Sequence, residues 1–302
     1  MDRTVNTTID KELCNGCGLC VEVCSHDTIS IQDGIACVTG EESSNCDHCS
    51  AACPNLAIRV ECVDSSMSEF NTFEADGKWL PHGRYDIRGL VNLMQSRRSC
   101  RNFLEKPVER SKIEDLVKIG ITAPSGTNCQ MWTFTILPDR QTVDTLGESI
   151  AKFYKNINGL ASKFWIRSSL KLFGKPELSW YYENYFESVK KGIDDWEKNG
   201  KDPLFHGATA VIIVGSKKEA SCPAEDALLA TQNILLAAHS MGLGTCLVGF
   251  VVNAMKKDKS ICRHVNIPDN ETPYAVIAMG YPDEKYVHVT GRKPVEMRYF
   301  AV

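Results

Sequence analysis

The sequence predicts a mixed α+β protein whose two parts differ in kind. Nine of the 14 cysteines fall within the first 62 of the 302 residues. From about Asp86 onward, amphipathic stretches at helical spacing alternate with short apolar runs rich in β-branched residues. A chain of this length has room for about two domains, so we expect a small cysteine-rich module followed by a larger domain with its own core.

The two parts also differ in charge. Residues 1–64 carry three Lys or Arg against eleven Asp or Glu, a net of −8, whereas residues 65–302 carry 31 against 27, a net of +4. This asymmetry favours docking between the parts or phosphate binding by the second, and it does not suggest nucleic acid. No apolar run approaches the roughly 20 residues that cross a bilayer, and the first residues lack the layout of a signal peptide. We therefore expect a cytoplasmic protein that is not bound to a membrane.

The first cysteine run has the spacing of an iron–sulfur site. It reads C-x-x-C-x-x-C-x-x-x-C, which lets one tight loop present three thiolates to a cluster while the fourth points away. Disulfides are disfavoured without a secretory signal, and zinc usually takes two separated pairs of ligands. The run consists of Cys14, Cys17, Cys20 and Cys24.

A second run, Cys46, Cys49 and Cys53 followed by Pro54, makes the module similar to the bacterial two-cluster ferredoxins. The resemblance implies a small βαββαβ domain with two [4Fe-4S] clusters. In that family the last cysteine of each run binds the other cluster. Carried over, cluster one is held by Cys14, Cys17, Cys20 and Cys53, and cluster two by Cys24, Cys46 and Cys49.

Cluster two lacks one cysteine in this sequence. Ser43 stands where the second run should begin, and Cys37, six residues earlier, is the nearest substitute thiol. Three alternatives stay open: Cys37 as a ligand, a serinate at Ser43, or a three-iron cluster.

The expected elements follow from local patterns. Asp33-Gly34 between alternating apolar residues predicts a hairpin. Residues 1–64 form the expected ferredoxin-type domain, the polar, turn-rich residues 65–87 a linker, and residues 88–302 the second domain. In the second domain we expect helices over 86–98 and 109–123 and strands over 131–137, 208–216, 245–250 and 274–281.

Three motifs in the second domain indicate ligand binding. Arg97–Phe103 offers guanidinium forks and a hydroxyl that suit a phosphate, although alone it is more often a charged turn. Ala123–Trp132 is a Gly-bearing loop that offers amides and hydroxyls to a polar ring edge, or simply connects two elements. Pro223, with Glu225 and Asp226, opens a helix that runs into Met241–Cys246.

Together with the closing Gly280-Tyr281-Pro282 and Gly291-Arg292-Lys293-Pro294, these motifs resemble the FMN-dependent nitroreductases over residues 88–296. The resemblance implies an intertwined homodimer with two FMN sites at its interface. Asn128 is then expected to bind the isoalloxazine edge, and Ser125 and Gly126 the flavin of the partner subunit. The implied FMN site as a whole comprises Arg97, Arg98, Ser99, Arg101, Pro124, Ser125, Gly126, Asn128, Leu243, Gly244, Arg292 and Lys293.

The combined resemblances imply an iron–sulfur flavoprotein oxidoreductase. Electrons pass from the clusters to FMN and on to a nitroaromatic, quinone or activated alkene, with a ferredoxin or NAD(P)H as the donor. Reductive dehalogenation uses the same fold, and a non-catalytic electron carrier or redox sensor is the alternative from another class. The flavin carries the chemistry, so no catalytic residue is assigned.

Several side chains have both a functional and a plain structural interpretation. His206 precedes an expected strand and could line the site, but a lone histidine in such a position more often has a structural role. Cys100 and Cys129 lie within the flavin motifs, but no paired base makes them nucleophiles. The aromatic-rich residues 160–205 could stack on a planar acceptor or form a buried helix face, and we favour core. These aromatic residues are Trp165, Trp180, Tyr181, Tyr182 and Phe186.

Overall fold

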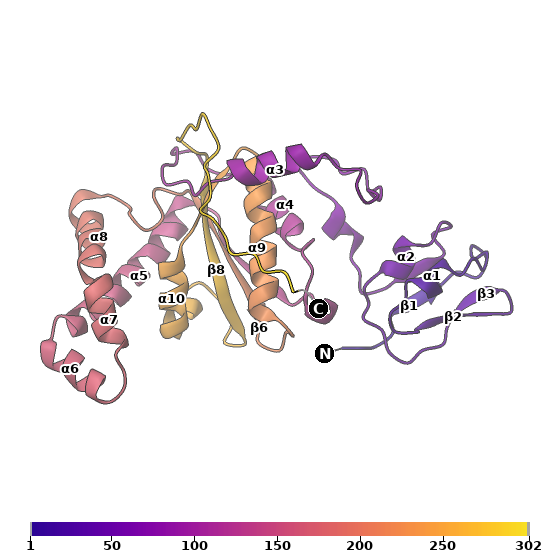
Figure 1. The fold of residues 1–302 in the computed structure, drawn as a ribbon, viewed down its shortest axis with the longest axis horizontal. Helices are drawn as coiled ribbons and strands as arrows, with labels where there is room; N and C mark the ends of the chain where they lie inside the picture. Colours follow the sequence, from indigo (N-terminus) through magenta and orange to yellow (C-terminus); the bar gives the residue numbers. More distant parts are fainter. Residues whose placement is uncertain (1, 301–302) are drawn as a thin grey trace.

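The computed structural model describes residues 2–300 and contains a small cysteine-rich module beside a larger three-layer domain (Figure 1). The module has the predicted βαββαβ order. Asp33 and Gly34 both have positive φ, 51° and 80°, as the turn of a two-residue hairpin requires. Its elements are β1 (Thr7–Ile9), α1 (Leu19–Glu22), β2 (Ile29–Gln32), β3 (Ile35–Val38), α2 (His48–Ala51) and β4 (Ile58–Val60).

The module is held by two antiparallel strand pairs. β2 pairs with β3 across the predicted hairpin, and β1 pairs with β4, which joins the beginning of the module to its end. Ile29, Ala36 and Ile58 are buried with Cys20 in a small core between them. So small a core buries little apolar surface, and domains of this size usually gain stability from bound metal.

The second domain is built on a four-stranded antiparallel sheet of order β5-β6-β8-β7. The strands are β5 (Trp132–Leu137), β6 (Ala210–Lys217), β7 (Gly244–Leu247) and β8 (Glu271–Gly280). The expected strand over 245–250 is too long. Strand β7 ends at Leu247, and Gly249 begins helix α10, so the last three residues of that prediction are wrong.

Helices cover both faces of the sheet. Seven of the eight residues of β6 are buried, because successive side chains enter different cores. Val211 and Ile213 contact one cluster, and Ala210, Ile212 and Val214 contact the other. The helices of the second domain are α3 (Ile87–Ser96), α4 (Arg110–Gly120), η2 (Gly126–Asn128), α5 (Arg140–Ala161), α6 (Phe164–Leu172), α7 (Glu177–Asn184), α8 (Phe186–Asn199), α9 (Pro223–Ser240), α10 (Gly249–Lys257) and α11 (Lys259–His264).

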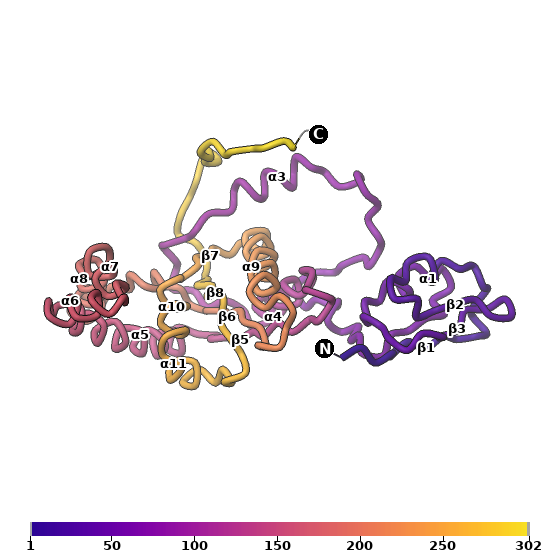
Figure 2. The backbone as a smooth tube through the Cα atoms, turned by 60° about the horizontal axis from the view of Figure 1, so that its bottom comes forward, coloured from indigo at the N-terminus to yellow at the C-terminus, as the bar shows by residue number. Residues whose placement is uncertain are grey.

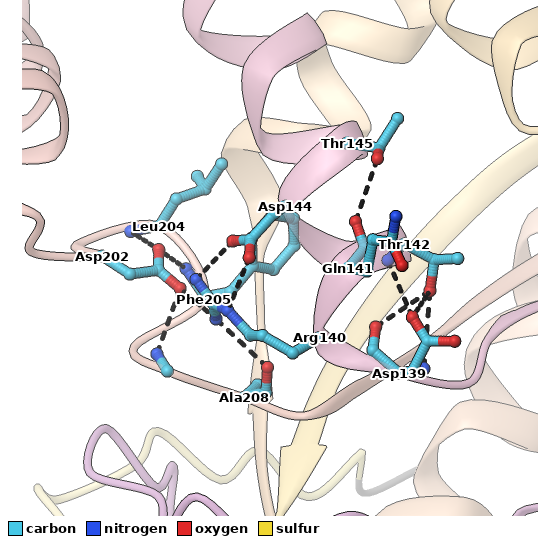
Figure 3. A network of polar contacts seen from close by, with 11 residues as sticks. Asp139, Arg140, Gln141, Thr142, Asp144, Thr145, Asp202, Leu204, Phe205 and Ala208 are labelled. Carbon is cyan, nitrogen blue, oxygen red and sulfur yellow. Dashed lines mark hydrogen bonds and ion pairs between the residues drawn. The ribbon is translucent and has the colours of Figure 1, made fainter.

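Helix α5 is fixed to the loop before β6 by one arginine (Figure 3). The Arg140 guanidinium donates to Asp144 and, at 2.7 Å, to Asp202, and it also reaches the carbonyl of Ala208. Asp202 in turn accepts the backbone amides of residues 204, 205 and 207. This network sets where β6 begins. Within residues 2–300, none of the helices is long and apolar enough to cross a membrane.

Two segments extend away from the sheet. Helix α3 and the C-terminal tail after β8 lie on the same side of the domain and reach beyond it (Figure 2). Much of their apolar surface is exposed: the side chains of Val287, Tyr299 and Phe300 are 88% exposed or more. Surface of this kind usually marks a contact with another molecule.

The segment between the two domains is fastened to helix α4. Asp115 is fully buried and accepts the backbone amides of Asn71 and Thr72 and the Thr72 hydroxyl. One turn away, Lys118 donates to the carbonyls of Ser66 and Glu69. The first half of the predicted linker therefore has a defined position, and this restricts where the ferredoxin-type module lies.

We expect Asp115→Asn to lower the free energy of unfolding by about 1.5 to 3 kcal/mol, the value of hydrogen bonds to a charged group. Burial acts to raise the pKa of Asp115, but the hydrogen bonds from Asn71 and Thr72 outweigh it and hold that pKa below its usual range. Because the folded-state pKa is lowered, the stabilisation is present above about pH 4 and is lost as pH falls through the folded-state pKa.

Urea unfolding at pH 7 and at pH 3 measures this effect. The matched control is Glu114→Gln, at the neighbouring exposed carboxylate of α4. Equal destabilisation by both substitutions at pH 7 would contradict the role of Asp115.

Candidate functional site

The thiols of the N-terminal module line two separate cavities. The first contains Cys14, Cys17, Cys20 and Cys53, so the last cysteine of the second run lies with the first run. Backbone amides already point at two of these sulfurs, from Ala36 to Cys14 and from Ala57 to Cys53, both at 3.3 Å. Such donors stabilise negative charge on sulfur, which suits thiolates bound to iron.

The second cavity contains Cys24, Cys46 and Cys49 together with Ser43. Cys37 is not among the residues that line it. Across residues 2–300, no three His, Cys, Asp or Glu side chains converge closely enough to hold a single metal ion. The thiols instead surround two spaces, which is the arrangement that a cluster with several iron atoms requires, since each iron takes its own ligand.

A group of arginines forms at the end of α9 in the second domain. Arg98 and Arg292 both donate to the Thr290 hydroxyl, at 2.8 and 3.1 Å, so the first motif meets the C-terminal segment. Burial, and then the nearby charges of Arg98 and Arg292, lower the pKa of Arg97. No ion pair among residues 2–300 neutralises these three arginines. Uncompensated guanidinium groups at one place fit a phosphate.

Strand β7 holds this arginine segment in place. Ser99 forms a bridge with Thr245, and the Cys100 amide donates to the Thr245 carbonyl at 2.9 Å. Gly244 is required here, because a Cβ on it would lie 2.8 Å from the Cys100 side chain. The predicted Leu243-Gly244 turn therefore packs against the predicted phosphate segment. Lys293 follows Arg292 in the exposed tail.

A carboxylate that the sequence analysis did not single out completes this region. Glu284 accepts the Arg101 backbone amide at 2.7 Å, the Asn102 side chain and the Tyr286 hydroxyl. Burial acts to raise the pKa of Glu284, but these hydrogen bonds outweigh it and lower the pKa. Glu284 thus positions the backbone of the arginine motif. Only its closeness to Gly280-Tyr281-Pro282 could have suggested a role from sequence.

The loop of the second motif lies at the opposite end of α9. Asp226, in the first turn of α9, accepts the Gly126 amide at 2.9 Å and faces the Cys129 thiol. At the far end, the last turn of α9 is near enough for Arg97 to lower the pKa of His239, after burial as the main cause. Helix α9 has 18 residues and is therefore about 27 Å long. One chain does not bring Pro124, Ser125, Gly126 and Asn128 together with Arg97, Arg98, Ser99, Arg101 and Arg292.

This loop has an unusual backbone. Thr127, Asn128 and Gln130 all have positive φ, between 48° and 55°. Such residues cost of order 1 kcal/mol each and persist where surrounding contacts hold them, often at functional sites. Here the Ser125 hydroxyl accepts the Gln130 amide, and Gln130 donates to Asn128.

Asn128 joins the loop to the ferredoxin-type module. Its side-chain amide donates to the carbonyls of Ser44 and Asn45, at 3.0 and 3.2 Å, directly before Cys46. A cleft of about 540 Å³ surrounds this contact and is lined from both domains, among others by Cys46, Cys62, Asn128 and Cys129. The loop that carries the second motif is therefore in contact with the predicted loop of cluster two.

The remaining candidates have structural roles. His206 lies in a turn with φ of 58°, and burial lowers its pKa, with Arg101 contributing, so the ring is neutral at pH 7. Burial raises the pKa of the Cys100 thiol, which donates to the Asn102 carbonyl. The Cys100 thiol therefore lacks the environment of a nucleophile, and the Cys129 thiol faces the Asp226 carboxylate.

The aromatic residues of 160–205 are only in part a core. Trp165 and Trp180 are 68% and 56% exposed, so our interpretation of them as core is wrong. Helices α6 to α8 stand apart from the sheet, and none of residues 2–300 forms a further layer over their outer faces (Figure 1). Trp180, Tyr181 and Phe250 line a groove of about 840 Å³ between α7 and α10. Tyr181 stacks on Tyr154, and burial strongly raises the pKa of Tyr181.

Comparison with known proteins assigns the family. The model of the Nitroreductase family matches residues 94–281, more than half of the chain. The chain belongs to the Nitroreductase family. A 4Fe-4S binding domain matches residues 7–30 of this family member. The predicted α+β fold class is confirmed, as is the prediction of a nitroreductase-like oxidoreductase with an N-terminal ferredoxin-type domain.

The individual relatives are distant. An iodotyrosine deiodinase of Thermotoga neapolitana is 26% identical over 66% of this chain and 91% of its own length. A 4-nitrobenzoate reductase of a Nocardioides strain is 24% identical over 70% of this chain and 88% of its own length. A solved nitroreductase with bound FMN from Bacteroides fragilis is 18% identical, with a TM-score of 0.49, and covers 70% of this chain and 97% of its own.

Asp226 is the residue that fixes the second-motif loop, and it is 2% exposed. We expect Asp226→Ala to cost about 1 to 3 kcal/mol of unfolding free energy, because the Gly126 amide loses its acceptor. Chemical denaturation measures the loss, and hydrogen exchange at Gly126 shows whether the loop opens. Glu225→Ala, at the exposed neighbouring carboxylate, is the control. Unchanged exchange at Gly126 in the Asp226 variant would refute this role.

Proposed function

We propose that this nitroreductase-family chain is an iron–sulfur flavoprotein that passes electrons from two clusters in residues 1–64 to FMN and on to a small organic acceptor. The contact of Asn128 with Ser44 and Asn45 carries the proposal, because it joins the cluster-two loop to a flavin-motif loop. An electron that leaves the module from cluster two therefore arrives beside the flavin domain.

In this proposal, different residues of the chain bind different parts of FMN. Arg97, Arg98 and Arg292 hold the FMN phosphate, and Ser99 and Arg101 hold the adjoining polar chain. Thr290 and Glu284 position these groups. The loop of Ser125, Gly126 and Asn128 is proposed to lie along the ring edge, with the Gly126 amide already donated to Asp226 and the Asn128 side-chain amide to Ser44 and Asn45.

We propose that the working form is a homodimer. The arginine group and the loop of Ser125 lie at opposite ends of α9, about 27 Å apart, so each supports a different flavin within one chain. A second copy related by two-fold symmetry brings the loop of one chain to the arginines of the other. The exposed apolar side chains of α3 and the tail, among them Ile87 and Val287, support burial by such a copy.

The acceptor is proposed to be a planar molecule. The groove beside Trp180, Tyr181 and Phe250 favours aromatic stacking over a purely electron-carrying role. Nitroaromatics, quinones and activated alkenes are the leading classes. The likeness to an iodotyrosine deiodinase supports halogenated phenols as the second class.

The cofactor and the acceptor are tested together. We expect Arg97→Gln to weaken FMN binding about ten- to a hundredfold, since hydrogen bonds to a charged group contribute about 1.5 to 3 kcal/mol. Fluorescence titration of the apoprotein with FMN measures this change, with the exposed Arg110→Gln as the control. Acceptor reduction falls with flavin occupancy and recovers at saturating FMN.

The same samples identify the acceptor. The reduced protein is mixed anaerobically with nitroarenes, quinones, enones and halophenols, and the return of flavin absorbance is timed after reduction by a ferredoxin or by NAD(P)H. Selective reoxidation by one class supports an enzyme. Acceptor reduction that survives complete loss of FMN contradicts the proposal, and uniformly slow reoxidation favours the electron-carrier alternative.

The contact between the domains has its own test. Asn128→Asp replaces two N–H donors with a carboxylate that faces two carbonyls, so we expect undocking of the module and slower flavin reduction by electrons that enter through the clusters. Direct chemical reduction of the flavin stays unchanged. Flash reduction at saturating FMN measures the rates of flavin reduction by both routes. The control is Asn233→Asp on α9, because the Asn233 side-chain amide donates to a hydroxyl, that of Thr122. Equal slowing of both routes would argue against a coupling role.

A further inference from the structure

The two cysteine loops follow the same backbone path, shifted by 29 residues. Cys17, Cys20 and Cys24 correspond in this way to Cys46, Cys49 and Cys53. The left-handed residues repeat as well: Gly16 at φ 69° corresponds to Asn45 at 50°, and Gly18 at 82° to Asp47 at 62°. Helix α1 begins one residue after Gly18, and α2 one residue after Asp47. Under this shift, Cys14 corresponds to Ser43.

Ser43 occupies the position of a ligand in space as well as in sequence. It is only 8% exposed, and it lines the cavity that also contains Cys24, Cys46 and Cys49. Its Oγ accepts the Asn45 backbone amide at 3.0 Å. That donor stabilises negative charge on the oxygen and leaves a second lone pair for another partner.

Cys37, the nearest other thiol, points elsewhere. It lies on β3 opposite Ser30, next to Ala36. Ala36 is buried in the small core and lines the first cavity, and adjacent side chains on a strand point to opposite faces. Cys37 therefore faces away from the cysteine core.

Four other polar side chains that line the second cavity, His26, Ser44, Asp47 and His48, do not occupy ligand positions. Both ring nitrogens of His26 are engaged, one with Arg3 and one with Ser25. Asp47 and His48 correspond, under the 29-residue shift, to Gly18 and Leu19, which are not ligands in the first loop. Ser44 corresponds to Asn15, which is also no ligand there.

We propose that Ser43 is the fourth protein ligand of the second cluster, with an Fe–O bond in place of the usual Fe–S bond. This inference rests on the proposed presence of two clusters. As the Fe–O bond forms, the serine O–H bond breaks and its proton is released to solvent, with no change in oxidation state. The oxygen ligand belongs to the cluster beside Asn128 and the flavin domain, whereas the first cluster keeps four cysteines.

The test compares variants of the full chain, purified anaerobically, by iron and sulfide content and by electron paramagnetic resonance. Two four-iron clusters give about eight iron atoms per chain. We expect Ser43→Ala to lower this to about seven and to give the signal of an oxidised three-iron cluster. Ser43→Cys keeps about eight iron atoms but changes the signal of the reduced second cluster, because the ligand changes from oxygen to sulfur.

Two controls isolate the ligand. Cys37→Ala removes the rival thiol, and Ser44→Ala removes the neighbouring hydroxyl, and both should leave iron content and spectrum as in the unaltered protein. The proposal is overturned if the unaltered protein already contains a three-iron cluster and Ser43→Ala changes nothing, or if Cys37→Ala is the variant that loses iron. Iron content of about four in the unaltered protein would instead refute the second cluster itself, and with it that part of the proposed function.

Discussion

Helix α9 determines where both halves of the proposed flavin site lie. It is buried against the sheet along one face, and it contacts the second-motif loop through Asp226 in its first turn. Its last turn meets the arginine segment. Because a packed helix is rigid over its length of about 27 Å, the two halves cannot approach each other within one chain. The proposed homodimer would meet this constraint by bringing the loop of one chain to the arginines of the other.

The rest of the domain holds the residues of the proposed site in an arrangement that costs free energy. Three arginines lie close together without an ion pair among the described residues, and the second-motif loop has three non-glycine residues with positive φ. Like charges and strained backbone both cost free energy, and the two cores around β6 offset that cost. A bound phosphate would relieve the repulsion among the three arginines, so this part of the domain is prepared for an anionic ligand.

The proposed electron transfer between the modules requires a defined distance, and three side chains fix where the ferredoxin-type module lies. Asp115 and Lys118 fasten the segment after the ferredoxin-type module to α4, and Asn128 contacts the module itself. All three pair a side chain with backbone groups, so the docking depends little on the side chains that the module presents. The acidic charge of the module and the slightly basic charge of the second domain attract each other and so also favour docking.

Local pattern in the sequence by itself determined the modules, the hairpin at Asp33-Gly34, most strands, and the residues of both cysteine runs, because spacing and turn chemistry act over short distances. It could not choose between Cys37 and Ser43, since strand alternation and burial decide which of them faces the cavity. Nor could it separate Asn128 from the arginines, or foresee Glu284 and Asp115 as anchors. Those roles depend on contacts between residues far apart in the chain, and only the tertiary structure decides them.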